Sequence, residues 1–175
     1  ESIQWEAEQY IPFDINDVNI DVQVLNPHTE GGQMDVLLVA AKSDMVNDYA
    51  EVVREAGLQP VVVDVDAFSV QNMFEMAYGF APGETVALIN LGASKVNINV
   101  VTSGTTAFTR DIAAGGNQLT DEIQKQLNVS YEEAEAYKLG GEPGGDVDTL
   151  IPQEVERVIQ QVAEQIALEV QRSLD

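Results

Sequence analysis

Three short β-type runs joined by tight turns, between Thr85 and Arg110, constrain the fold of this chain more than any other feature. The first run is apolar and ends at a Gly-Ala-Ser turn, residues 96–100 alternate between apolar and polar side chains, and a Ser-Gly pair leads into residues 105–110. Strands joined by turns this short run antiparallel. The pattern therefore predicts an antiparallel meander of three strands.

The front half of the chain predicts a separate α/β region. Residues 18–24 alternate strictly, as a strand with one solvated face does, and residues 34–41 form an apolar run typical of a buried strand. A helix is expected between Ser43, its N-cap, and Gly57, the residue after its C-cap. Residues 60–66 are apolar and β-branched, which predicts a third strand. Strand, helix and strand in this order indicate a βαβ-like unit.

Apolar residues at helical spacing predict the other helices. Two of these helices carry clear start signals, because Gly115 and Gly116 precede one and Ser130 and Glu133 form a capping box at the next. The glycine-rich stretch 140–145 is interpreted as a loop before the last helix. Helices are expected at residues 1–11 and 67–78, after Gly116, after Ser130, and from Pro152 to the end.

Both ends of the chain are abrupt. The sequence begins at Glu1 within a helical pattern, and it stops at Asp175 within another that has no Gly or Asn C-cap. We interpret the chain as an internal fragment of a longer protein. An Ala-Pro-Gly sequence at residues 81–83 marks an expected boundary between subdomains.

The charge balance argues against two classes of partner. The 175 residues include 30 acidic side chains against 8 basic ones, a formal net charge of −22. Neutralising nucleic-acid phosphates or an anionic membrane surface takes clustered Lys and Arg, so neither partner is expected. No apolar run reaches the roughly 18 residues of a membrane-spanning helix. Membrane insertion is therefore not expected, and the cytosol is the expected location.

Residue types that often carry catalysis or metals are scarce. The chain has no cysteine, which excludes disulfides, a thiolate nucleophile and Cys-ligated metals. Its one histidine, His28, excludes a His-cluster metal site and argues against a Ser-His-Asp triad. The pairs Asp64 with Asp66 and Asp146 with Asp148 lack the spacing of a calcium-binding loop. No catalytic residue and no metal site is therefore assigned.

The turn that follows the first strand of the meander is a candidate phosphate site. Asn90, Gly92, Ala93 and Ser94 form a β-turn-β segment that can present backbone N–H groups and a hydroxyl to a phosphate. Taken alone, the same segment is an ordinary hairpin.

Two later features strengthen the ligand interpretation. Gly115 and Gly116 stand where a helix begins, so a flat ligand could approach the backbone near the positive end of the helix dipole. Glu135 and Lys138 place a carboxylate and an ammonium one turn apart on one helix face. The simpler alternatives are a helix entry that needs a positive φ and a surface ion pair.

Taken together and in this order, these motifs resemble those of the actin-like ATPase superfamily. Within it the similarity is close to the PilM-type type IV pilus assembly proteins, relatives of the cell-division protein FtsA. The segments that carry the resemblance are residues 90–94, 108–120 and 132–138. At the front of the chain, residues 5–13 and 56–68 resemble the opening and the exit of the family's extra subdomain, called 1C.

The resemblance implies the fold class and the domain organisation. The class is α/β (α+β), with a partial actin-like, ribonuclease H-like ATPase fold. Residues 1–65 would form subdomain 1C, residues 66–82 the connecting helix of subdomain 1A, and residues 83–175 part of the nucleotide-binding subdomains 2A and 2B.

The resemblance also implies ATP with Mg²⁺ as the ligand of the intact protein. The positions that match the second phosphate loop are Asn90, Gly92, Ala93 and Ser94, and those that match residues flanking the adenosine are Gly115, Gly116, Glu135 and Lys138. Many members that hydrolyse ATP have Asp at position 90, where a carboxylate orders Mg²⁺ and its waters. The amide of Asn90 therefore indicates weak or absent hydrolysis. This segment by itself is expected to bind ATP weakly or not at all.

The partner that the resemblance implies is the cytoplasmic N-terminal peptide of an inner-membrane pilus protein, PilN. Family members bind it in a groove that involves subdomains 1A and 1C, which places them in the cytoplasm at the inner membrane. Other pilus assembly proteins are expected as further partners. Trp5, Tyr10 and Phe13 lie close together in the sequence and are candidates for a partner surface.

Three alternatives remain open from the residues alone. The chain could belong to an FtsA-like cell-division protein or another protein of the actin superfamily, to a small-molecule kinase of the same superfamily, or to an interaction module without a ligand. A kinase needs a carboxylate base beside the glycine-rich strands. Because the stretches around Asn90 and Asn97 are rich in amides and free of acids, the sequence favours a scaffold.

Overall fold

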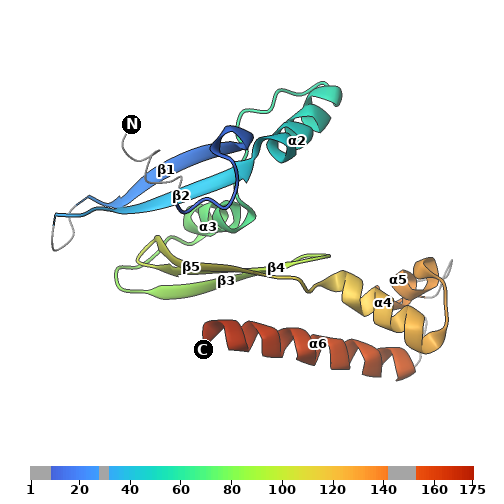
Figure 1. The fold of residues 1–175 in the computed structure, drawn as a ribbon. Coiled ribbons are helices and arrows are strands. Elements are labelled where there is room, and N and C mark those ends of the chain that lie inside the picture. Colours follow the sequence, from blue (N-terminus) through green and yellow to red (C-terminus); the bar gives the residue numbers. More distant parts are fainter. Residues whose placement is uncertain (1–8, 28–31, 142–152) are drawn as a thin grey trace. The chain divides into compact units, whose positions relative to one another are not determined.

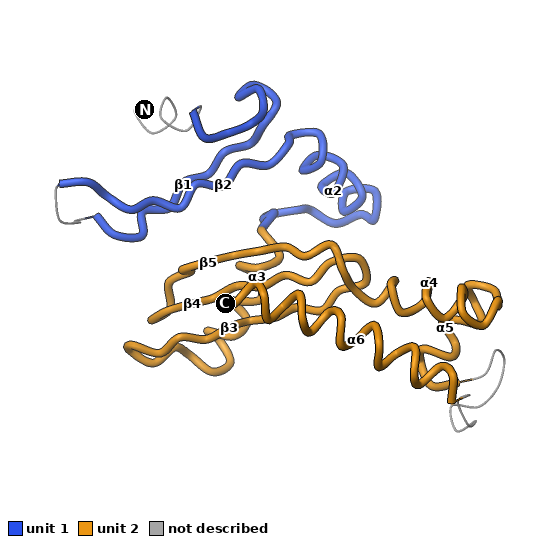
Figure 2. Tube along the Cα trace, turned by 60° about the horizontal axis from the view of Figure 1, so that its bottom comes forward, with its two compact units in different colours: residues 1–64 blue, residues 65–175 orange. Residues whose placement is uncertain are grey.

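The computed structural model describes residues 9–27, 32–141 and 153–175 (Figure 1). The chain divides into two compact units, Glu1–Asp64 and Val65–Asp175 (Figure 2). The assignment of these units to subdomains 1C, 1A, 2A and 2B stays a prediction.

The first unit contains a two-stranded antiparallel sheet followed by one helix. Val18 lies opposite Lys42 and Val24 lies opposite Val36, and the register shifts just after Val24. Its small core consists of Ile11 and Val18, against which Ile20, Leu38 and Ala40 pack. Its elements are η1 (Ile15–Asp17), β1 (Val18–Asn26), β2 (Asp35–Lys42) and α2 (Ser43–Glu55).

The expected strands at 18–24 and 34–41 are confirmed as β1 and β2, with one correction. β2 is half-buried or exposed along its length instead of buried, because it belongs to a sheet of two strands. Ser43 is the first residue of α2, and the N-cap position falls to Lys42, which makes no side-chain capping bond. Gly57 follows the C-cap with φ +79°, a conformation that favours glycine.

The third strand predicted over residues 60–66 is wrong. Residues 58–65 have no regular secondary structure, and the next helix begins at Asp66. A strand needs a neighbour for its N–H and C=O groups, and neither sheet of the described residues includes this segment. Val61 and Val62 are 84% and 77% exposed. The predicted βαβ-like unit is therefore not formed.

The second unit contains the predicted meander, a three-stranded antiparallel sheet in the order β3-β4-β5. One helix, α3, packs on a face of this sheet, and α6 runs along the opposite face (Figure 1). Its elements are α3 (Asp66–Ala77), β3 (Thr85–Leu91), β4 (Val96–Thr102), β5 (Thr105–Ile112), α4 (Gly116–Leu127), α5 (Tyr131–Lys138) and α6 (Gln153–Leu174).

A polar cluster fastens α3 to the sheet. Asn99, which is 1% exposed on the central strand, donates from Nδ2 to the Ala67 carbonyl at 3.2 Å and to the Gln71 side chain at 2.9 Å. Thr106 on β5 donates to the same Gln71 oxygen at 2.6 Å. Since Asn97 is two residues from Asn99 on the same strand, both side chains lie on the α3 face of the sheet.

The three helices after the sheet share a core of their own. Ile123 of α4, Ala134 of α5, and Val155 and Val158 of α6 are all buried in one cluster. This packing fixes the relative position of α4 and α5. The capping box at Ser130 is confirmed, so the start of α5 is also well defined.

Two sequence expectations fall largely outside the described residues, the helix at 1–11 and the glycine-rich loop after Gly140. The same holds for Trp5 and His28. Among the described residues, no helix has both the length and the apolar character that crossing a membrane takes.

Candidate functional site

The hairpin turn between β3 and β4 is bonded directly to the start of α4. The N–H of Gly116 donates to the Gly92 carbonyl at 3.0 Å, and the N–H of Asn117 donates to the Ala93 carbonyl at 2.8 Å. The turn itself is closed by the Gly92 N–H, which donates to the Lys95 carbonyl at 2.8 Å. The two glycine-containing segments that the sequence singled out therefore form one joined structure.

Gly115 is required by this close approach and not by a positive φ. Its φ of 172° is extended backbone that any residue adopts. A Cβ at this position would lie 2.5 Å from the Gly92 carbonyl oxygen and 2.6 Å from the Ala93 carbonyl oxygen. Only a residue without a side chain fits between these two backbone groups.

The same bonds limit what the start of α4 can offer a ligand. The sequence places the positive end of a helix dipole near the candidate site, and in the structure the N–H groups of Gly116 and Asn117 donate to the hairpin, and that of Gln118 donates to Gly115. A helix N-terminus binds anions through unsatisfied N–H groups. These groups of α4 are occupied by the protein itself.

Donors that remain available lie at the tip of the hairpin. Ala93 and Ser94 are exposed, and within the described residues neither N–H donates a hydrogen bond. The Ser94 hydroxyl adds a third polar group at the same tip. Adjacent N–H groups and a hydroxyl can together donate hydrogen bonds to an anionic oxygen.

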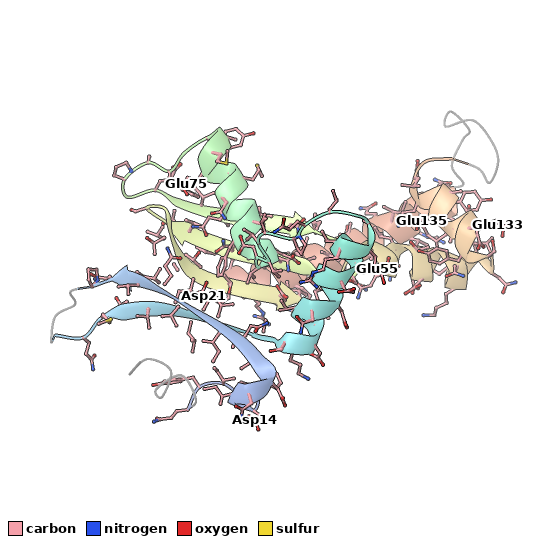
Figure 3. The ribbon with its side chains drawn as sticks, turned by 90° about the horizontal axis from the view of Figure 1, so that it is seen from above. Asp14, Asp21, Glu55, Glu75, Glu133 and Glu135 are labelled. Atoms are coloured by element: carbon pink, nitrogen blue, oxygen red, sulfur yellow. The ribbon has the colours of Figure 1, made fainter. Side chains whose placement is uncertain are left out.

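Glu135 and Lys138 lie beside the glycine turn. Their carboxylate and ammonium are 2.6 Å apart, and the Lys138 Nζ is 3.5 Å from the Gly116 carbonyl oxygen. A Cβ at Gly116 would be 3.8 Å from this Nζ and 3.9 Å from the Ala93 Cα. The surface over Gly116 is therefore bordered by an ammonium on one side and by the hairpin on the other. Figure 3 labels Glu135 on its helix.

Sequence reasoning missed Thr120, which connects these groups. Its side chain is fully buried, and its hydroxyl lies 2.7 Å from the Glu135 carboxylate and 3.0 Å from the Lys138 Nζ. Thr120 is one helical turn after Gly116, and that spacing was the available signal.

The pKa of Glu135 is held below its usual value. The hydrogen bond from Lys138 has the largest effect, the one from Thr120 comes next, and partial desolvation opposes both. The carboxylate of Glu135 is therefore the stable form over a wider pH range, which keeps the ion pair with Lys138 intact in mildly acidic solution.

Asn90 belongs to a row of polar side chains across the sheet. Its Nδ2 donates to the Asn97 side chain at 3.1 Å, and the Nδ2 of Asn97 donates to the Asp111 carboxylate at 2.7 Å. Lys95 lies 3.7 Å from the other Asp111 oxygen. The surroundings of Asn90 were expected to be free of acids, and Asp111 corrects that expectation. The strand register, which places these three residues opposite one another, could have indicated it.

The described residues contain no group of three or more His, Cys, Asp or Glu side chains suited to a metal ion. Two hollows of about 410 and 330 Å³ are found among the described residues. They are lined by residues of α6 and by residues around η1 and the start of α2. Neither hollow includes a residue of the candidate site.

Comparison with solved structures defines the class of fold. MreB5 of Spiroplasma citri bound to ADP matches with a TM-score of 0.54 and 18% identity over 77% of this chain and 48% of that chain. The ethanolamine utilization protein EutJ from Carboxydothermus hydrogenoformans matches with a TM-score of 0.53 and 21% identity over 94% and 73%. The chain thus has a partial actin-like ATPase fold.

A closer similarity defines the family. The structure of a PilM–PilN type IV pilus biogenesis complex matches with a TM-score of 0.79 and 27% identity over 99% of this chain and 49% of that chain. The family described as type IV pilus assembly protein PilM matches residues 1–175. The chain therefore belongs to the type IV pilus assembly protein PilM family, and it spans about half the length of the PilM chain that it matches.

The two glycines are expected to respond differently to the same substitution. Gly115→Ala should lower the free energy of unfolding by about 1–3 kcal/mol, because the new methyl group overlaps two backbone carbonyls. Gly116→Ala should change it by less than about 1 kcal/mol, since all neighbours of the new methyl group are at ordinary contact distance. Urea unfolding followed by circular dichroism measures both. Equal effects of the two substitutions would contradict the described contact.

We expect the Glu135 carboxyl to titrate below an ordinary Glu, and Lys138→Met to raise its pKa. Because the folded state lowers this pKa, the carboxylate contributes stability fully above its unfolded pKa of about 4.3 and loses it as the pH falls through the folded value. The stability difference between the wild type and Glu135→Gln should shrink over that range. NMR of the carboxyl carbon and urea unfolding at several pH values measure the two effects.

The matched control is Lys125→Met, which removes a lysine from the same kind of one-turn pair with Glu122 on α4. It should leave the Glu135 titration unchanged. A Glu135 pKa that does not respond to Lys138→Met would show that the ion pair is not formed in solution.

Proposed function

We propose that the natural protein containing this sequence is an ATP-binding, actin-like scaffold of type IV pilus assembly. It would act in the cytoplasm and dock the cytoplasmic N-terminal peptide of a PilN-like inner-membrane protein. One observation supports the proposed ATP binding. The hairpin tip, the two glycines and the Glu135–Lys138 pair lie close together in the structure. These segments are separated in the sequence, and family resemblance predicts that they surround one ligand.

The donors available at the hairpin suit a phosphate group. The exposed N–H groups of Ala93 and Ser94 and the Ser94 hydroxyl would hold phosphate oxygens. The open surface over Gly116, between Ala93 and the Lys138 ammonium, would receive the flat nucleoside. The MreB5 structures, which contain ADP or AMPPNP, support a nucleotide as the ligand through the fold they share with this chain.

The chain's own residues would give Mg²⁺ few ligands. Asn90 offers an amide oxygen, and the Asp111 carboxylate is already engaged with Asn97 and Lys95. Mg²⁺ is commonly bound through substrate phosphates and water with one or two carboxylates, and when bound it would neutralise phosphate charge. The scarcity of carboxylates supports weak or absent ATP hydrolysis.

The proposed binding of a PilN-like peptide rests on the match, at 27% identity, between this chain and a chain in the structure of a PilM–PilN complex. In the first unit, Tyr10 is 79% exposed and Phe13 is 49% exposed. The Lys42 ammonium lies 5.1 Å from the centre of the Phe13 ring and holds it on the surface by a cation–π contact. Exposed aromatic side chains are enriched at protein interfaces, so these two residues are proposed to contact the peptide.

In the natural protein, Gly116→Ala should weaken ATP binding by about tenfold or more, which corresponds to ~1.4 kcal/mol or more. The methyl group would occupy the surface next to Lys138 without disturbing the fold. Isothermal titration calorimetry measures the dissociation constant. The matched control is Gly141→Ala, whose added Cβ also has room, 3.9 Å from the Ala136 carbonyl oxygen. Equal ATP affinity in wild type and Gly116→Ala would refute the proposed nucleoside position.

The peptide part is tested with a synthetic peptide that carries the cytoplasmic N-terminus of the PilN-like protein from the same organism. Tyr10→Ala should weaken its binding by about fivefold, a typical effect of removing an interface aromatic. Fluorescence anisotropy of the labelled peptide measures the affinity. Tyr131→Ala, an exposed tyrosine of the second unit, is the control. If the wild type does not bind the peptide, the partner assignment is wrong, and ATP binding is unaffected by that result.

A further inference from the structure

The hydroxyl of Thr120, on α4, makes its two short hydrogen bonds to residues of a different helix. Thr120 is 0% exposed in the first turns of α4, and its hydroxyl faces two residues of α5. The Oγ1 atom lies 2.7 Å from the Glu135 Oε2 and 3.0 Å from the Lys138 Nζ. One buried hydroxyl thus links both charged groups of the candidate site to the helix that begins at Gly116.

The chemistry of these contacts assigns a direction to each hydrogen bond. A hydroxyl has one proton to donate and two lone pairs to accept with. Glu135 is an acceptor only and the Lys138 ammonium is a donor only, so Thr120 donates to the carboxylate and accepts from the ammonium. The Gly116 carbonyl, 3.3 Å from Oγ1, is the more distant possible acceptor. Valine, which has the same shape, can make neither bond.

Three acceptors surround the Lys138 ammonium, and they differ in strength. The Glu135 carboxylate is at 2.6 Å, Thr120 at 3.0 Å and the Gly116 carbonyl at 3.5 Å. The two short contacts leave the ammonium little freedom to rotate away. The long contact is the one that an acceptor group of a ligand over Gly116 could replace.

We propose that Thr120 is a positioning residue, which holds the Lys138 ammonium and the Glu135 carboxylate in the orientation in which they contact the nucleoside part of ATP. This inference rests on the proposed ATP binding of the natural protein. Thr120 itself, fully buried under the two charged groups, does not touch the ligand.

The test compares hydroxyl-bearing and hydroxyl-free side chains at position 120 in the natural protein. Thr120→Val keeps the shape and removes both hydrogen bonds, whereas Thr120→Ser keeps the hydroxyl. Thr106→Val is the matched control, because Thr106 is a partly buried threonine on β5 of the same unit, and its 2.6 Å hydrogen bond goes to Gln71 of α3, away from the candidate site. If Thr120→Val does not fold, Thr120→Ala carries the same expectation.

We expect Thr120→Val to weaken ATP binding by about fivefold or more, measured by titration calorimetry, and Thr120→Ser and Thr106→Val to stay within about twofold of the wild type. NMR of the Glu135 carboxyl should show that its pKa rises in Thr120→Val and not in Thr120→Ser. Rescue by serine together with the Glu135 titration distinguishes positioning from a general loss of stability.

Three results would overturn the proposal. ATP affinity within about twofold of the wild type in Thr120→Val would exclude a positioning role and leave ATP binding intact. Equal weakening by Thr106→Val would assign the effect to general loosening of the unit. Absence of ATP binding by the wild type would remove the proposed function, and the role of Thr120 with it.

Discussion

Two hydrogen bonds from the first N–H groups of α4 to the carbonyls of the β3–β4 hairpin are the interaction on which the candidate site depends. They join Gly116 to Gly92 and Asn117 to Ala93, and they form only because Gly115 has no side chain. Once α4 is fixed to the sheet in this way, the buried cluster around Ile123 places α5 against α4. The position of Lys138 beside the glycine turn follows from these two contacts.

The distribution of charge in the chain bears on which ligand the candidate site can bind. A net charge of −22 repels a polyanionic ligand over most of the surface. Two of the 8 basic side chains, Lys95 and Lys138, nevertheless belong to the hairpin and to the helix beside it. Lys138 is only 16% exposed, so its charge is screened less by solvent than that of Lys95, which is 62% exposed. The Glu135 carboxylate, 2.6 Å from the Lys138 ammonium, balances this charge. The pair therefore offers hydrogen-bonding groups to a polar ligand beside Gly116, and the exposed N–H groups of the hairpin tip suit a phosphate.

The parts of the fold that depend on local signals could be predicted from the sequence. The three-strand meander follows from alternation and short turns, and the capping box at Ser130 follows from residue type and spacing alone. The strand predicted at 60–66 does not form. Its β-branched residues favour a strand, but a strand also needs a neighbouring strand for its hydrogen bonds, and neither sheet of the described residues includes this segment. Thr120 and Asp111 were missed because their roles arise from partners on other elements.

The sequence by itself determined the local elements, the family resemblance and the residue types gathered at the candidate site. The tertiary structure decided which of their polar groups remain available. The N–H groups of Gly116 and Asn117 look free in the sequence but donate to the hairpin, while those of Ala93 and Ser94 stay open. The physical reason is that a hydrogen-bonding group is satisfied by whichever partner packing brings within reach, and here those partners are more than 20 residues away along the chain.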